Sequence, residues 1–306
     1  MQVLDARNRI LGVEHPDTVK ATGKLAATYR DLAKYTDAEK LQIQVLDAST
    51  RILGVEHPDT ITGMAQLAVT YQTTGKYTEA VKLNIQVLDA RTRILGVEHP
   101  HTITGMAHLA DTYQSLGKYK EAEKLQIQVL DSSTRILGVG HPATITGMAH
   151  LAATYNNLGK YTEAEKLQIQ VLDARNKNLG VEHPHTIFAM ANLASTFSCL
   201  GKYTKAEKLQ IQVLDSSTRI LGVGHPATIT GMAHLAATYK NLGKYTEAEK
   251  LQIQALDANT RILGVDHPHT INAITYQNLG MYTEAETLAV QAQETGNRFS
   301  EQNFHI

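Results

Sequence analysis

The chain has 306 residues, with 29 basic and 30 acidic side chains and a single cysteine. This balance disfavours a nucleic-acid binder, which would carry a basic excess, and one cysteine excludes an intrachain disulfide and a thiolate-rich zinc site. The sequence shows no signal peptide and no apolar run long enough to span a bilayer, so we expect a soluble cytoplasmic protein that binds neither nucleic acid nor membrane.

A 42-residue repeat runs through the sequence. It is marked by a His-Pro pair whose histidine stands at positions 15, 57, 99, 141, 183, 225 and 267. A second marker, Gly-Lys-Tyr, recurs in phase and begins at positions 75, 117, 159, 201 and 243. A fixed period in this range indicates a solenoid of stacked units. Such an array exposes long surfaces instead of enclosing a pocket, which favours binding over chemistry.

In chain order, residues 1–14 match only the second helix of a repeat. Six full repeats are predicted to follow, at 15–56, 57–98, 99–140, 141–182, 183–224 and 225–266. Residues 267–294 form a truncated terminal repeat, because five residues are missing from its first helix, and residues 295–306 form a polar tail. We therefore expect a single array that spans residues 1–306.

The first helix of each repeat is predicted from one apolar stripe. In the repeat that begins at His99, apolar side chains recur at steps of three and four at Ile103, Met106, Ala110, Tyr113 and Leu116. This is the spacing of one helix face. Gly117 follows and can end the helix in a left-handed conformation. The methionine of this stripe recurs in other repeats and is predicted to fill the core.

The second helix of the same repeat begins near Tyr119 and carries two stripes. One contains Ala122, Leu125 and Val129, and the other contains Ile127, Leu130, Thr134 and Leu137. We expect the first stripe and the second stripe to contact two different neighbours, the partner helix and the next repeat. No repeat is then stable alone, because each needs its neighbours to cover its apolar surface.

The helix ends carry capping signals. Thr162 to Glu165 matches a capping box at the start of a second helix, although that helix could instead start at the tyrosine. Gly138 is predicted to form a left-handed cap, with Val139 folded back on the last turn. Proline after the histidine suits the first helical position. We interpret the histidines of the His-Pro pairs as packing residues at the junctions between repeats.

The sequence therefore predicts an all-α protein, a right-handed α-solenoid of stacked antiparallel helix pairs. The sequence also indicates a duplication, because residues 131–174 and residues 215–258 differ at only two positions. An 84-residue block of two repeats has been duplicated. The first repeat departs from the others at Ala33, which replaces the glycine of the loop between the helices. If that position is left-handed, the alanine costs roughly 1 kcal/mol.

The repeat resembles the tetratricopeptide motif, and in particular the kinesin light chain-like repeats of the fungal branch. The matching positions are Leu109, Ala110, Tyr113, Gly117, Tyr119, Ala122 and Val129. The 34-residue unit of that motif is lengthened by eight residues in the second helix and its exit. The resemblance covers essentially the whole chain and implies the solenoid fold and a role in protein interaction. Because no heptad coiled coil precedes the repeats, binding to kinesin heavy chain is not expected.

The resemblance also places the first helices on the concave side, where a protein or peptide partner would bind. Many grooves of this family carry paired asparagines before the motif leucine. In this chain, only Asn192 matches one of those asparagines. We predict that the following outward positions form the binding surface: Lys24, Gln66, Gln72, His108, Asp111, Gln114, His150, Asn156, Asn192, Ser198, His234 and Lys240. Small, amide and imidazole groups there could bind an extended peptide or a partner helix. The alternative is that these positions are merely solvated.

Similar fungal arrays often follow nucleotide-binding signalling domains. A second interpretation of the chain is therefore a regulatory or ligand-sensing array that belongs to a larger signalling protein. We expect no enzyme activity and no cofactor, because the chain contains neither a phosphate-binding loop nor a serine nucleophile elbow. We also expect no metal site, since the histidine pairs such as His99 and His101 lack a carboxylate or thiol at a consistent offset.

Overall fold

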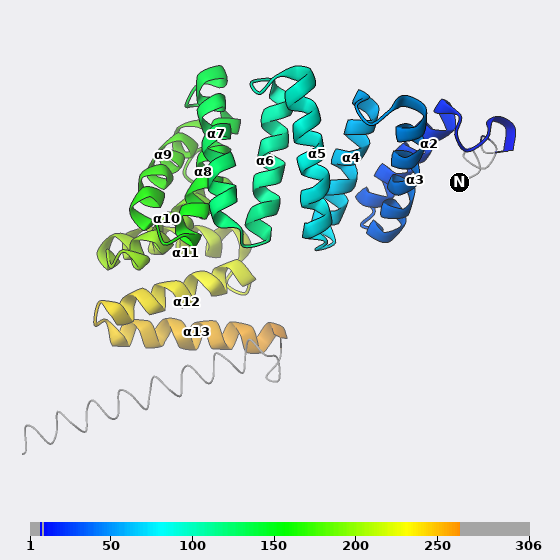
Figure 1. The fold of residues 1–306 in the computed structure, drawn as a ribbon. Coiled ribbons are helices and arrows are strands. Elements are labelled where there is room, and N and C mark those ends of the chain that lie inside the picture. The colour runs from blue at the N-terminus through cyan, green and yellow to red at the C-terminus, as the bar shows by residue number, and fades with distance from the viewer. Residues whose placement is uncertain (1–6, 8, 264–306) are drawn as a thin grey trace, which may run out of the picture. The chain divides into compact units, whose positions relative to one another are not determined.

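The computed structural model describes residues 7 and 9–263. The described part is built from helices that alternate between 16 and 19 residues in length, and the all-α prediction is confirmed for it (Figure 1). Their bounds are α2 Pro16–Asp31, α3 Tyr35–Leu53, α4 Pro58–Thr73, α5 Tyr77–Leu95, α6 Pro100–Ser115, α7 Tyr119–Leu137, α8 Pro142–Asn157, α9 Tyr161–Leu179, α10 Pro184–Cys199, α11 Tyr203–Leu221, α12 Pro226–Asn241 and α13 Tyr245–Leu263. The predicted truncated repeat and polar tail lie outside the described residues, as do residues 1–6 of the predicted partial repeat.

The chain forms two compact units, Met1–Leu167 and Gln168–Ile306. In the first unit, α2 pairs with α3, α4 with α5 and α6 with α7, and the second helix of each pair also packs against the first helix of the next. The second unit repeats this arrangement with α10, α11, α12 and α13. Each first helix is joined to its partner by a three-residue loop, so the two helices of a pair run antiparallel.

Small side chains bring the paired helices close together. Ala68 of α4 and Ala80 of α5 are fully buried, and the same two alanine positions are buried in the other described pairs. Beside them, Ile61, Met64 and Val87 form a buried cluster with Ala90. The methionine position is buried in every described repeat that has one, so its predicted role as core filler is confirmed.

The second apolar stripe of the 19-residue helices is not covered as predicted. Ile127 and Leu137 of α7 are 45% and 46% exposed, and Thr134 is also exposed. The helix instead buries one stripe of mainly small or polar residues, which includes Ala122, Gln126 and Ser133. Since α7 packs against both α6 and α8, this one stripe serves both neighbours. The prediction of two separately buried stripes is therefore wrong.

The histidines of the His-Pro pairs cap helices. In each 16-residue helix from α2 to α12, the histidine is the N-cap residue, and its side chain accepts a hydrogen bond from the backbone N–H two residues later. His57 Nδ1 lies 3.2 Å from the backbone nitrogen of Asp59, for example. The proline occupies the first helical position, as predicted. The histidine satisfies one of the free amides of the first turn, a role that the packing interpretation missed.

The 19-residue helices begin at the tyrosine, so the capping-box interpretation is wrong. Their N-cap residue is the lysine of Gly-Lys-Tyr, and Lys34, Lys76, Lys118 and Lys202 make no side-chain capping hydrogen bond. Thr162 therefore lies inside the first turn of α9 rather than at its cap. The alternative start at the tyrosine is confirmed.

The glycines at the two kinds of loop adopt different conformations. Gly117 has φ +72°, and Ala33 takes the same place in the first repeat with φ +57°, so its predicted left-handed conformation is confirmed. Gly138, by contrast, has φ +86° and ψ +159°, a region that only glycine adopts readily. Val139 is 61% exposed. The predicted left-handed cap with a folded-back valine is therefore wrong.

Candidate functional site

The second unit contains a groove of about 480 Å³ between α10 and α12, with α11 as its floor. The 16-residue helices α10 and α12 supply its walls. Its lining is mostly apolar: Pro184, Ile187, Phe188 and Ala191 from α10, Val213, Ile220 and Leu221 from α11, and Ala227 and Gly231 from α12. A groove of this volume lies within the range that binds small molecules or short peptide segments.

Phe188 distinguishes this groove from the corresponding positions of other repeats. Four other repeats have threonine at this place, at positions 62, 104, 146 and 230, and the first repeat has Lys20. The phenyl ring is 62% exposed although it lies in an apolar lining. Aromatic side chains, phenylalanine included, are enriched in protein interfaces relative to the rest of the surface.

Polar groups complete the lining of the groove. Asn192, Ser195 and His234 come from the walls, and Gln210 and Ser217 come from the floor. Gln210 is 7% exposed, and its Oε1 has no hydrogen-bond partner. The equivalent oxygens of Gln42, Gln126 and Gln168 also lack a partner. A buried amide oxygen without a donor is unfavourable, and its recurrence shows that this cost belongs to the repeat rather than to this groove.

The twelve predicted binding residues are all at least partly exposed. The structure brings Asn192 and His234 together in the groove of the second unit. In the first unit it brings Asp111 of α6 and His150 of α8 together, with Asp111 Oδ1 at 3.2 Å from His150 Nδ1. His108 occupies the equivalent place in the repeat before His150, but the residue of α6 that pairs with His150 is Asp111. The other predicted positions are spread over the 16-residue helices: α4 and α6 carry two each, and α2, α8, α10 and α12 carry one each.

An arginine occupies the junction between α5 and α6. Arg91 donates Nη1 to the backbone oxygen of His101 at 2.9 Å, and it lies close to Gly105, where an added Cβ would be 3.7 Å from that nitrogen. Arg175 makes the same contact with the oxygen of His185 at 2.8 Å, and Arg7 with that of Asp17 at 3.0 Å. Burial lowers the pKa of the Arg91 guanidinium.

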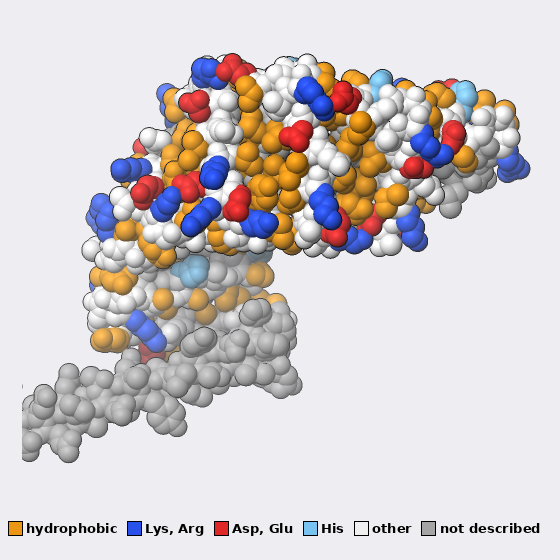
Figure 2. Space-filling model, in the orientation of Figure 1, with side chains coloured by type: hydrophobic (Ala, Val, Ile, Leu, Met, Phe, Trp, Pro, Cys, Tyr) orange, Lys and Arg blue, Asp and Glu red, His pale blue; other side chains and the backbone are white. Residues whose placement is uncertain are grey.

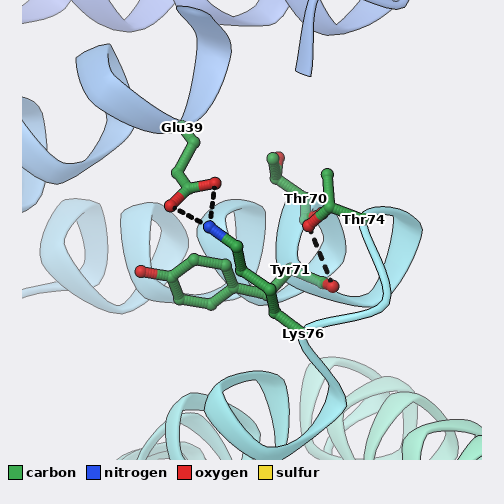
Figure 3. Close-up of polar contacts among 5 residues, drawn as sticks. All are labelled: Glu39, Thr70, Tyr71, Thr74 and Lys76. Atoms are coloured by element: carbon green, nitrogen blue, oxygen red, sulfur yellow. Dashed lines mark hydrogen bonds and ion pairs between the residues drawn. The ribbon is translucent and has the colours of Figure 1, made fainter. Parts of the chain in front are cut away.

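Ion pairs link the loop of one repeat to the second helix of the repeat before it. Lys76 Nζ lies 2.7 Å from Glu39, Lys160 lies 2.6 Å from Glu123, and Lys244 lies 2.6 Å from Glu207. Figure 3 shows the Lys76 side chain beside the Tyr71 ring with its ammonium between both Glu39 oxygens. The three glutamates are only 13–17% exposed, so they belong to the joint between repeats.

Neither a metal centre nor a membrane-spanning helix is found among the described residues. Among residues 7 and 9–263, histidine, cysteine, aspartate and glutamate side chains nowhere gather in a group of three or more that could hold a metal ion. In the same part of the chain, the helices lack the combination of length and apolar character that crossing a membrane requires. Figure 2 shows charges of both signs interspersed with hydrophobic side chains over α4 to α7.

Comparison with known families decides the class of the protein. Tetratricopeptide repeat models match residues 17–93, 63–135, 102–156 and 143–219, and a further tetratricopeptide repeat model matches 228–269. The first four matches together cover more than half of the chain. The protein belongs to the tetratricopeptide repeat family.

Solved structures place this tetratricopeptide repeat protein among the kinesin light chain-like arrays. The crystal structure of a kinesin light chain candidate from Podospora anserina, with nearly identical TPR-like repeats, is 30% identical, with a TM-score of 0.61 over 67% of this chain and 98% of that one. BtubC (BKLC) from P. vanneervenii has the same TM-score at 18% identity, over 78% of this chain and 93% of that one, and shares the fold. No curated protein matches the sequence.

Several residues of the tetratricopeptide groove escaped the sequence analysis. Phe188, Gln210 and Ser217 line it, yet only outward positions of the first helices were considered. Comparison of the repeats with one another could have found Phe188, because an apolar aromatic residue replaces threonine or lysine there. Gln210 carried no such signal, since the same glutamine is repeated in most units.

Proposed function

We propose that the protein is an interaction scaffold that binds a peptide or a helix of a partner protein along the groove formed by its 16-residue helices. The observation that carries this proposal is the apolar groove of the second unit, whose polar side chains include two of the residues predicted from the sequence, Asn192 and His234. Membership of the tetratricopeptide repeat family supports a role in protein interaction. The protein then acts by binding rather than by catalysis.

The chemistry of the groove suits an uncharged segment. Apolar side chains form most of the lining, and they bury the apolar side chains of a partner. Asn192 and Ser195 provide hydrogen-bonding groups at the walls, which can meet the backbone of an extended peptide or the polar edge of a helix. The groove includes no lysine, arginine, aspartate or glutamate, so strong charge plays no part in recognition there.

A library of 15-residue peptides displayed on phage tests the proposal. We expect the purified chain to enrich a family of related sequences, and the enriched peptides to bind at least tenfold more weakly to the double variant Asn192→Ala, His234→Ala. Gln212→Ala is the matched control, because Gln212 is exposed on α11 and does not line the groove. If no sequence is enriched, or if the double variant binds as well as the wild type, the proposed function is wrong.

A further inference from the structure

The position of Ser217 alternates between two residue types along the chain. Serine occupies it at Ser49, Ser133 and Ser217, which are 84 residues apart. Arginine occupies it at Arg7, Arg91 and Arg175, which are also 84 residues apart. The two types therefore alternate from Arg7 to Ser217 with a period of two repeats, and the next equivalent position, Asn259, carries neither type. This superperiod matches the length of the duplicated block.

The two residue types shape the junction differently. Arg91 reaches from α5 to the backbone of His101 and lies against Gly105 on α6. The equivalents of these two residues beside Ser217 are Ala227 and Gly231, which line the open groove. The arginine side chain thus covers the same wall that the serine leaves uncovered. The lowered pKa of the Arg91 guanidinium, caused by burial, agrees with a side chain that packs into the junction.

The serine-type junctions of the two units differ in a second way. Beside Ser133, the pair of Asp111 and His150 joins α6 to α8 at 3.2 Å. Beside Ser217, the equivalent residues are Ser195 and His234, which both line the groove. Phe188 replaces a threonine at its mouth. The junction beside Ser217 therefore combines an uncovered wall, an apolar lining and an exposed aromatic ring.

We propose that the groove beside Ser217 receives an aliphatic side chain of an uncharged partner segment, and that Arg91 closes the corresponding junction of α4, α5 and α6. This proposal rests on the proposed function and names the site and the ligand chemistry within it. The neutral and mostly apolar lining matches an uncharged segment, and Phe188 supplies an exposed apolar contact.

N-Acetyl-leucinamide is the probe for a direct test, because it carries one aliphatic side chain and a backbone amide and has no charge. Its binding is followed by NMR of the chain, in which the phenylalanine rings and the isoleucine methyl groups are isotope-labelled. We expect saturable shifts at Phe188 and Ile220. The α-amides of N-acetyl-glutamic acid and N-acetyl-lysine, which carry charged side chains, should bind at least tenfold more weakly than N-acetyl-leucinamide. Equal binding of the charged compounds would overturn the assigned chemistry.

Ser217→Arg places the arginine of the closed junctions in the open groove. We expect N-acetyl-leucinamide to bind this variant at least tenfold more weakly than the wild type. Thr218→Arg is the matched control, because it adds the same charge at the exposed neighbouring position and should bind normally. Phe188→Thr, which restores the residue of four other repeats, should also weaken binding. Arg91→Ser should add a second set of saturable shifts, at Ile94 of α5, which is the equivalent of Ile220.

The outcomes separate this inference from the proposed function. If selected 15-residue peptides bind the chain but Ser217→Arg and Phe188→Thr leave both peptide and N-acetyl-leucinamide binding unchanged, the assigned groove is wrong while the scaffold function stands. If neither peptides nor N-acetyl-leucinamide bind the wild type, both proposals fail. If sedimentation shows a wild-type dimer that Ser217→Arg dissociates, the groove holds a second copy of the chain, and the assignment to a partner segment is overturned.

Discussion

Lys76 holds its ammonium group 2.7 and 2.8 Å from the two carboxylate oxygens of Glu39, which lies 37 residues earlier in the chain. The hydrogen bond to Glu39 raises the pKa of Lys76, and the same relationship raises the pKa of Lys160 and Lys244. The tyrosines beside these lysines also have raised pKa values, mainly through burial. The joint between successive repeats is therefore sensitive to the loss of the lysine charge.

These shifts predict a loss of stability at alkaline pH. A group whose folded pKa is raised stabilises the fold fully below its unfolded pKa and stops doing so as the pH rises through the folded value. The ordinary pKa of lysine is 10.5, so the contribution should be constant near neutral pH and vanish above that value. Urea unfolding of the wild type and of the triple variant Glu39→Gln, Glu123→Gln, Glu207→Gln measures it. The stability difference between them should shrink above pH 10.5, and a constant difference would contradict the assignment.

One repeat lacks the glutamate of this ion pair. Val81 stands where Glu39, Glu123 and Glu207 stand in other repeats, 37 residues before Lys118. We expect Val81→Glu to form the missing pair and to stabilise the array by about 0.5 kcal/mol, the scale of a partly exposed ion pair. Urea unfolding at low salt is the measurement. Val81→Gln is the control, because it has a similar size without charge; equal stability of the two variants would show that no pair forms.

Removal of a capping histidine should speed hydrogen exchange in the first turn of its helix, and α4 provides the test. His57 Nδ1 accepts from the amide of Asp59, and the removal of such a cap costs about 1 kcal/mol. His57→Ala should therefore speed hydrogen exchange of the first-turn amides about fivefold. His57→Asn should keep slow exchange, since asparagine is a preferred N-cap residue. Similar exchange in the two variants would mean that the histidine acts through packing alone.

Two glycines should respond oppositely to alanine. Gly138 ends α7 with φ +86° and ψ +159°, so Gly138→Ala should destabilise the protein by about 1–3 kcal/mol through backbone strain. Gly147 lies inside α8, and an added Cβ there would meet no atom within 4 Å. Gly147→Ala should stabilise by about 0.5–1 kcal/mol, because alanine favours a helix interior over glycine. Thermal unfolding measures both, and a loss of stability at Gly147 would contradict the open space around it.

The repeat period predicted most of the fold because packing imposes the same residues in every unit. Ala68, Met64 and Ala80 recur at fixed offsets, and their burial follows from helical spacing alone. The start of the second helix was less certain, since Thr162 and Glu165 also satisfy a capping box. Which start is adopted depends on the three-residue loop before Tyr161, whose geometry is not visible in the hydrophobic pattern.

Contacts between repeats were harder to predict than the repeats themselves. His150 could have faced His108, Asp111 or neither, because the choice depends on how far one helix is offset from the next. Arg91 illustrates the same limit. Its sequence position marks it as different from Ser133, but only the packed structure shows that its guanidinium reaches the backbone of His101.

Neighbouring repeats also provide a test of buried hydrogen bonds. Asn84 Nδ2 donates to Thr112 Oγ1 at 3.0 Å, and both side chains are buried. Gln126 and Thr154 have the same separation along the chain, but neither the Gln126 amide nor the Thr154 hydroxyl has a hydrogen-bond partner. The asparagine is shorter than the glutamine by one methylene, and this changes where its amide lies relative to the threonine. The two threonines therefore occupy equivalent sites with different bonding.

Thr112→Val should destabilise the protein by about 1–3 kcal/mol, because it leaves the Asn84 amide buried without an acceptor. Thr154→Val should be neutral or stabilising, since it replaces a buried hydroxyl that bonds to no other group with a methyl group of similar size. Urea unfolding of both variants gives the comparison, and a cycle of Asn84→Ala, Thr112→Val and the double variant of the two isolates the pairwise energy. Equal losses at the two threonines would show that the Asn84 bond contributes nothing, and that burial of the hydroxyl alone sets the cost.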